Sequence, residues 1–99
     1  MRIPSYIVSV PIPWKEDPSF DKELFTEILG ELKSQYCDGL YLFGTSGEGN
    51  AITDEEFLEI VSHFKEQTWD FQGFLQVGCF GLSSAQVKLR CAVCLGVGI

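Results

Sequence analysis

The chain has 99 residues, 45% of them hydrophobic and 13% aromatic, which is the composition of one small globular domain and excludes intrinsic disorder. Its fourteen acidic and seven basic residues give a formal net charge of −7. This charge argues against binding to nucleic acid or to an anionic membrane surface, because both need clustered Lys and Arg.

Three short apolar runs predict β-strands. They lie at Tyr6–Val10, Leu40–Phe43 and Phe74–Val77, and Gly, Pro or Asp residues bound them. Each run is nearly continuous in apolar character instead of alternating between apolar and polar residues. This pattern is typical of strands in a parallel sheet that is covered on both faces.

A helical pattern follows each of the first two strands. After the first strand, Asp21 is expected to cap a helix, whose apolar face is formed by Leu24, Phe25, Ile28, Leu29 and Leu32. After the second strand, Thr53 and Glu56 form a capping box, in which each side chain bonds the backbone of the other residue. The buried stripe expected on this second helix consists of Phe57, Leu58, Ile60, Val61 and Phe64.

A third helical pattern follows the third strand. Ser83 and Gln86 provide a helix start, and Gly96 is expected to end the helix. The apolar positions of this helix are Val87, Leu89, Ala92, Val93 and Cys94. Val97–Ile99 resembles the threshold of a fourth strand.

The resulting order β-α-β-α-β-α predicts right-handed βαβ units on a parallel α/β sheet, with no linker and no second domain within residues 1–99. Three strands with one helix each would leave two open sheet edges and incompletely covered faces. A doubly wound fold or a barrel would bury these surfaces, but a barrel takes about 250 residues. We therefore expect the chain to be a piece of a longer protein.

The four cysteines are Cys37, Cys79, Cys91 and Cys94. Cys91 and Cys94 have the spacing of half a zinc site or of a redox pair, but no second such pair is present and His63 is the single histidine. The pair also falls within an apolar helical run. We therefore expect these residues to pack as small buried hydrophobes, and we expect no metal site.

No stretch approaches the ~18 apolar residues of a membrane span, and residues 1–13 lack the features of a secretory signal. Without such a signal the expected location is the cytoplasm, where thiols stay reduced.

The segment Gly44–Gly49 (Gly-Thr-Ser-Gly-Glu-Gly) begins where the second strand ends. In parallel α/β folds the active site lies at the carboxyl ends of the strands. Glycines allow backbone N–H groups to approach a ligand, and the hydroxyls of Thr45 and Ser46 can donate or accept hydrogen bonds. The segment is neither a P-loop nor a dinucleotide-binding fingerprint. It suits a small carboxylate or phosphate, although a hydrogen-bonded turn without a ligand has the same residues, and Glu48 would then anchor it.

This segment, with the capped acidic helix start at Thr53–Glu56, resembles the dihydrodipicolinate synthase / N-acetylneuraminate lyase family. Asp38–Leu40 is similar to the family's lead into its second strand, and Pro13–Trp14 is similar to its first loop. Val77–Gly78 lies where the family has its third strand. The resemblance therefore spans almost the whole chain in the family's order.

The resemblance implies that the chain is the amino-terminal β-α-β-α-β-α portion of a (β/α)₈ TIM barrel, a single incomplete domain. Family members are commonly homo-oligomers that form a Schiff base between a lysine and pyruvate or a related 2-keto acid, without a cofactor, and then catalyse aldol addition or cleavage. By this resemblance, Thr45 relays protons or contacts the keto acid, and Ser46 binds its carboxylate. Fixing the carboxylate would turn the carbonyl toward the lysine.

The chain departs from the family in three respects, of which the mildest is Ser46, where the family often has Thr and the hydroxyl is kept. Ile12 stands where the family often has Thr, so one hydroxyl near the site is lost. The catalytic Tyr and the Schiff-base Lys of the family lie on later strands, and none of the present lysines matches; Lys15, after the first strand, is not assigned as a nucleophile. We therefore expect these 99 residues alone to be inactive. The alternatives are a truncated gene product, a fragment that binds another chain through its strand edges, and a small metal or redox protein built on Cys91 and Cys94.

Overall fold

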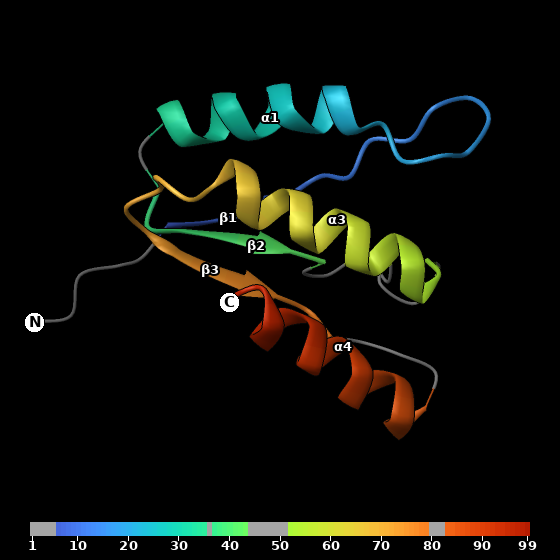
Figure 1. The fold of residues 1–99 in the computed structure, drawn as a ribbon. Helices are drawn as coiled ribbons and strands as arrows, with labels where there is room; N and C mark the ends of the chain where they lie inside the picture. The colour runs from blue at the N-terminus through green and yellow to red at the C-terminus, as the bar shows by residue number, and fades with distance from the viewer. Residues whose placement is uncertain (1–5, 36, 44–51, 80–82) are drawn as a thin grey trace, which may run out of the picture.

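The computed structural model describes residues 6–35, 37–43, 52–79 and 83–99, in which three parallel strands alternate with three helices (Figure 1). In chain order the elements are β1 (Ile7–Val10), α1 (Lys22–Ser34), β2 (Gly39–Leu42), α3 (Asp54–Gln67), β3 (Phe74–Val77) and α4 (Ser84–Gly96). The predicted β-α-β-α-β-α order is confirmed, and the strand bounds agree with the sequence to within one residue. None of the helices in the described ranges has both the length and the apolar character needed to cross a membrane.

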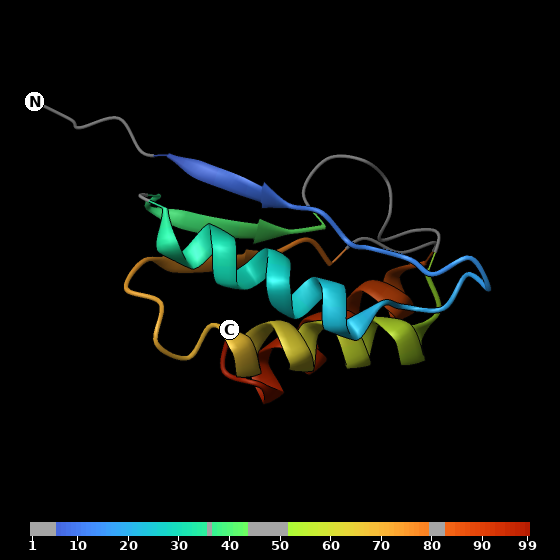
Figure 2. The ribbon, with the colours of Figure 1, turned by 90° about the horizontal axis from the view of Figure 1, so that it is seen from above.

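The sheet has the strand order β1-β2-β3, with both pairs of neighbours parallel. Figure 2 shows the strands on one side and the helices on the other. Strand residues that point toward the helices, such as Val10 and Leu42, are buried, whereas Ile7 and Phe74 in the alternate positions are 47% and 41% exposed. The expectation of strands covered on both faces is therefore not met within the described residues.

All three predicted helix starts are confirmed. The Asp21 carboxylate accepts a hydrogen bond from the backbone N–H of Leu24 at 3.0 Å. At α3 the capping box is complete: the Glu56 N–H donates to the Thr53 hydroxyl at 3.0 Å, and the Thr53 N–H donates to the Glu56 carboxylate at 2.8 Å. The Ser83 hydroxyl accepts from the Gln86 N–H at 3.2 Å. These contacts fix the first turn of each helix by satisfying N–H groups that have no partner inside the helix.

Helix α3 packs between α1 and α4 and contributes most of the helical core. Its buried side chains are Phe57, Ile60, Val61, His63 and Phe64. The prediction that Leu58 belongs to this stripe is wrong, because Leu58 is half exposed. The buried face of α3 includes His63 in place of Leu58, and His63 faces α1.

His63 joins α3 to α1 through a polar contact inside the apolar core. Its Nε2 lies 2.7 Å from the hydroxyl of Thr26, and that hydroxyl already donates to the Lys22 carbonyl at 3.0 Å. Because a hydroxyl carries one proton, this arrangement assigns the donor role to His63 Nε2. The other ring nitrogen, Nδ1, is then a buried acceptor, and it has no hydrogen-bond partner among the described residues.

The end of the chain forms a turn, and the resemblance of Val97–Ile99 to a strand threshold is not borne out. Helix α4 ends at Gly96, as expected, and the backbone then closes on it: the Val97 N–H donates to the Val93 carbonyl and the Ile99 N–H to the Cys94 carbonyl. Gly98 has φ of 88°, a conformation that glycine adopts without steric cost. The turn brings Val97 and Ile99 against the apolar core.

Candidate functional site

In the sequence the predicted site directly follows β2, and the ends of the parallel strands lie at one edge of the sheet. The segment 44–51, which includes the predicted site residues Thr45 and Ser46, lies outside the described residues. The residues on either side of it are described, and they show how the polypeptide leaves β2 and reaches α3.

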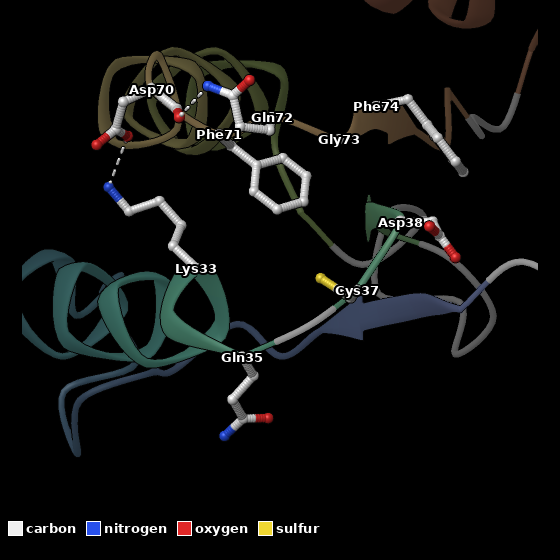
Figure 3. A pocket seen from close by; sticks show the side chains of 9 residues that line it. All are labelled: Lys33, Gln35, Cys37, Asp38, Asp70, Phe71, Gln72, Gly73 and Phe74. Carbon is white, nitrogen blue, oxygen red and sulfur yellow. Dashed lines mark hydrogen bonds and ion pairs between the residues drawn. The ribbon is translucent and has the colours of Figure 1, made fainter.

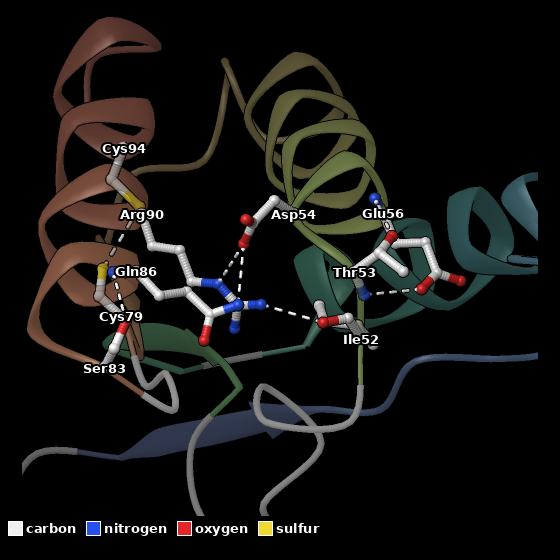
Figure 4. Close-up of polar contacts among 9 residues, drawn as sticks. All are labelled: Ile52, Thr53, Asp54, Glu56, Cys79, Ser83, Gln86, Arg90 and Cys94. Carbon is white, nitrogen blue, oxygen red and sulfur yellow. Dashed lines mark hydrogen bonds and ion pairs between the residues drawn. The ribbon is translucent and has the colours of Figure 1, made fainter.

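Phe43 and Ile52 flank the predicted loop; Phe43 contacts Phe57, and Ile52 contacts Arg90, a contact that Figure 4 shows. Phe43 has φ of 60° and its ring stacks on that of Phe57, with 5.3 Å between the ring centroids. The Arg90 guanidinium also lies over the Phe57 ring, 4.9 Å from its centroid, and its Nη2 donates to the Ile52 carbonyl at 3.0 Å. One aromatic ring and one buried cation therefore hold the described residues on either side of the segment 44–51.

Arg90 also joins α4 to the first turn of α3. Its Nε lies 3.3 Å from the Asp54 carboxylate, and the Gln86 side-chain amide donates to the same carboxylate oxygen at 3.1 Å. The Arg90 side chain is almost fully buried, whereas that of Asp54 is 46% exposed. Asp54 thus neutralises a buried cation from the surface. Its negative charge also interacts favourably with the positive end of the helix dipole at the start of α3.

Sequence reasoning missed Arg90. The residue lies in the predicted helix between Leu89 and Ala92, and it was not among the positions expected to be buried. In the structure Leu89 is 49% exposed and Arg90 is buried, so the helix is rotated from the expected orientation. An available signal was the acidic Thr53–Glu56 segment, since an arginine one helix away is a suitable partner for its carboxylates.

The loop after β1 lies at the same edge of the sheet as the predicted site. It folds back on itself, with an isolated antiparallel bridge between Trp14 and Phe20. Ile12 is buried in the core. Lys15 is exposed, and its backbone N–H donates to the Ser19 carbonyl. The described contacts of Lys15 give it no catalytic partner.

A hollow of about 850 Å³ lies at the opposite edge of the sheet, near the amino ends of the strands (Figure 3). Its rim carries the Lys33–Asp70 ion pair, with 2.9 Å between Nζ and Oδ1. The hydrogen bond from Lys33 lowers the pKa of Asp70. Both side chains are substantially exposed, so the pair contributes little to stability. In parallel α/β folds this edge is not where catalytic residues gather.

The structure adds a third cysteine to the Cys91 and Cys94 pair. Cys79, just beyond β3, has its sulfur 3.7 Å from that of Cys94. Cys94 is buried, as predicted for a packing residue, but Cys91 is exposed, so the packing prediction is wrong for Cys91. Burial raises the pKa of Cys79 to about 12, with smaller contributions from both other thiols. Among the described residues, no group of three or more Cys, His, Asp or Glu side chains is arranged to hold a metal ion.

Comparison with known proteins identifies relatives of one kind. The chain is 35% identical over 60 residues to the 4-hydroxy-tetrahydrodipicolinate synthase of Streptococcus suis, a match that covers 61% of this chain and 19% of the relative. The dihydrodipicolinate synthase from Aquifex aeolicus matches with a TM-score of 0.84 and 21% identity, over 95% of this chain and 31% of that one. YagE from E. coli K12, a prophage protein of the dihydrodipicolinic acid synthase family crystallised with pyruvate, matches with a TM-score of 0.84 and 21% identity. This match covers 93% of the present chain and 30% of YagE. No family model matches the chain.

The three described strand–helix units form the start of a (β/α)₈ TIM barrel of the dihydrodipicolinate synthase type. The chain is related to the dihydrodipicolinate synthase family of lyases, as its sequence indicated. It spans about a fifth of the length of the curated relatives that it matches.

Proposed function

We propose that this chain is the part of a Schiff-base-forming lyase that holds the carboxylate of pyruvate or a related 2-keto acid. The observation that supports this proposal most strongly is the 35% identity to a 4-hydroxy-tetrahydrodipicolinate synthase. The pyruvate complex of YagE, which shares the fold, favours a 2-keto acid as the substrate class.

In this proposal the carboxylate binds in the Gly44–Gly49 segment. The hydroxyl of Ser46 and nearby backbone N–H groups hold the carboxylate, and Thr45 contacts the keto acid or relays a proton. Holding the carboxylate fixes the direction of the ketone carbonyl, which is the carbon that a lysine attacks. The contacts of Phe43 with Phe57 and of Ile52 with Arg90 support the proposal because they fix a residue on each side of this segment.

The 99 residues by themselves are proposed to lack catalytic activity. Four of the five lysines lie on helices (Lys22, Lys33, Lys65 and Lys88) and Lys15 lies in the loop after β1. None matches the position of the family's Schiff-base lysine. A carboxylate-binding segment without a nucleophile would bind a keto acid weakly and leave it unchanged.

A second candidate function is association with another polypeptide through the sheet. Two observations favour it. One face of the sheet is not covered by described residues, so Ile7 and Phe74 are exposed. The edge strands β1 and β3 also have no second neighbour among the described strands. Unpaired strand edges are templates for pairing with another chain. Size-exclusion chromatography with light scattering tests this candidate, and a stable, cooperatively folding monomer would contradict it.

The test of the first proposal is borohydride trapping with pyruvate, followed by mass spectrometry. Two proteins are compared: the chain itself, and a chimera that joins it to the part of the Aquifex aeolicus synthase that it does not cover. We expect no covalent adduct on the chain and an adduct on the chimera, at a lysine outside residues 1–99. In the chimera, Ser46→Ala should raise the KM for pyruvate, whereas Ser34→Ala, at the far end of α1, should not. A KM unaffected by Ser46→Ala in an active chimera would contradict the proposed carboxylate site.

A further inference from the structure

Three of the four cysteines gather between the end of β3 and α4: Cys79 precedes Cys91 by 12 positions and Cys94 by 15. The Cys79 and Cys94 sulfurs are 3.7 Å apart, a contact drawn in Figure 4. Cys91 lies one helical turn before Cys94 and close enough to Cys79 to raise its pKa. Together they line an open hollow of about 510 Å³ beside β3.

We propose that Cys79, Cys91 and Cys94 form a thiol–disulfide exchange site that reacts with small-molecule disulfides such as glutathione disulfide and ends as a Cys79–Cys94 disulfide. The two sulfurs are 3.7 Å apart, so they need to approach by less than 2 Å to reach the bond length of about 2.05 Å. The site is independent of the proposed keto-acid function, because it uses none of the same residues.

The three thiols differ in exposure, and this difference assigns their order of reaction. Cys91 is exposed, Cys79 is partly buried and Cys94 is buried. Burial raises the pKa of both Cys79 and Cys94, so neither is readily ionised at neutral pH. Since the thiolate is the attacking species, the first reaction with an external disulfide falls to Cys91.

The exchange proceeds in three balanced steps. The Cys91 thiolate attacks one sulfur of glutathione disulfide, the S–S bond breaks, and one glutathione leaves as a thiolate that takes up a proton. Cys79 then loses its proton and attacks the Cys91 sulfur, which releases the second glutathione. Finally the Cys94 thiolate attacks the Cys79 sulfur and Cys91 is released as a thiol. In sum, two protein thiols are oxidised and one glutathione disulfide is reduced to two glutathiones.

The product would tie the end of β3 to the middle of α4. Cys79 also contacts the Val77 carbonyl, so the bond would attach the helix directly to the sheet. It would close a loop of 15 positions, and such a cross-link stabilises the folded state by restricting the unfolded chain. Oxidation should therefore raise the Tm of the chain.

The test is to incubate the reduced, folded chain with glutathione disulfide and to map its disulfides by non-reducing peptide mass spectrometry. We expect a monomer that has lost two hydrogen atoms, a Cys79–Cys94 linkage, and free thiols at Cys37 and Cys91. The same treatment in urea should spread the bonds over all four cysteines. A folded chain whose final bond joins Cys91 to Cys94, or which stops at a glutathione adduct on Cys91, would overturn the proposal.

Two variants separate the roles of the thiols. Cys91→Ser should slow formation of the Cys79–Cys94 bond by about tenfold or more, without changing the final product, because the exposed attacking thiol is gone. Cys37→Ser is the matched control, since Cys37 lies at the other end of the sheet and should affect neither rate nor product. An unchanged rate in Cys91→Ser would contradict the order of steps, and a linkage to Cys37 in the folded chain would contradict the site itself.

Discussion

Replacing Arg90 by Met tests whether the contacts of Arg90 with Ile52 and Phe57, beside the predicted loop, stabilise the fold. Met has a long unbranched side chain, so the substitution keeps much of the packing volume of the arginine stem and removes the charge and the donors. The Ile52 carbonyl, on a residue that is only 7% exposed, would lose its donor. The Phe57 ring would lose the cation above it.

The expected cost follows from these two losses. An unsatisfied buried carbonyl costs about 1–3 kcal/mol, and a partly desolvated cation over an aromatic ring is worth about 0.5–2 kcal/mol. The Asp54 carboxylate is 46% exposed and can be hydrated once its partner is gone, so the ion pair adds little. We expect Arg90→Met to lower the free energy of unfolding by about 2–4 kcal/mol, a large part of the ~5–15 kcal/mol typical of a folded protein.

Urea denaturation followed by far-ultraviolet circular dichroism measures this difference. The matched control is Lys88→Met, the same kind of change at an exposed position of the same helix, which should stay within about 0.5 kcal/mol of the unmodified chain. Equal losses for Arg90→Met and Lys88→Met would refute the account of a buried arginine that stabilises the fold through Ile52 and Phe57.

Two further predictions concern His63 and the glycines of the sheet. Burial, and then the charge of Lys22, lower the pKa of His63 in the folded state, so the unfolded chain binds this proton more readily. The free energy of unfolding should therefore fall as the pH drops through about 6.5. Urea titrations near pH 8 and pH 5.5 measure this difference, and His63→Gln should make it smaller. Gly73→Ala should destabilise more than Gly39→Ala, because a Cβ at Gly73 meets the rigid backbone of residue 38, whereas at Gly39 it meets the Phe74 ring, which can turn aside. Thermal unfolding compares the two variants, and Phe74→Ala should rescue only Gly39→Ala; equal destabilisation would contradict this reasoning.

The fold could be predicted largely from local signals in the sequence. The capping residues Asp21, Thr53 and Ser83 act through contacts three residues away, so their sequence neighbours are sufficient to identify them. The short apolar runs identified the strands for a similar reason. The exposed face of the sheet could not be read from these runs, since their continuous apolar character is the same whether one face or both are covered.

The features that the sequence did not reveal depend on contacts between distant segments. Arg90 is buried because Ile52 and Asp54 lie beside it, 36 to 38 positions earlier in the chain. Cys79 meets Cys94 because α4 returns along β3. Neither contact leaves a periodic pattern in the sequence. For the candidate site, the sequence provides the residue types of Thr45 and Ser46, and their roles stay a prediction because they lie outside the described residues.

The central claim is that this chain contributes the carboxylate-binding segment of a keto-acid lyase and not its nucleophile. Borohydride trapping with isotopically labelled pyruvate, applied in parallel to the chain and to its chimera with the Aquifex aeolicus synthase, tests this claim most directly. We expect label in the chimera alone, on a lysine outside residues 1–99, with a higher KM for pyruvate when Ser46 is replaced by Ala. Stoichiometric label on Lys15 or any other lysine of the isolated chain would contradict it.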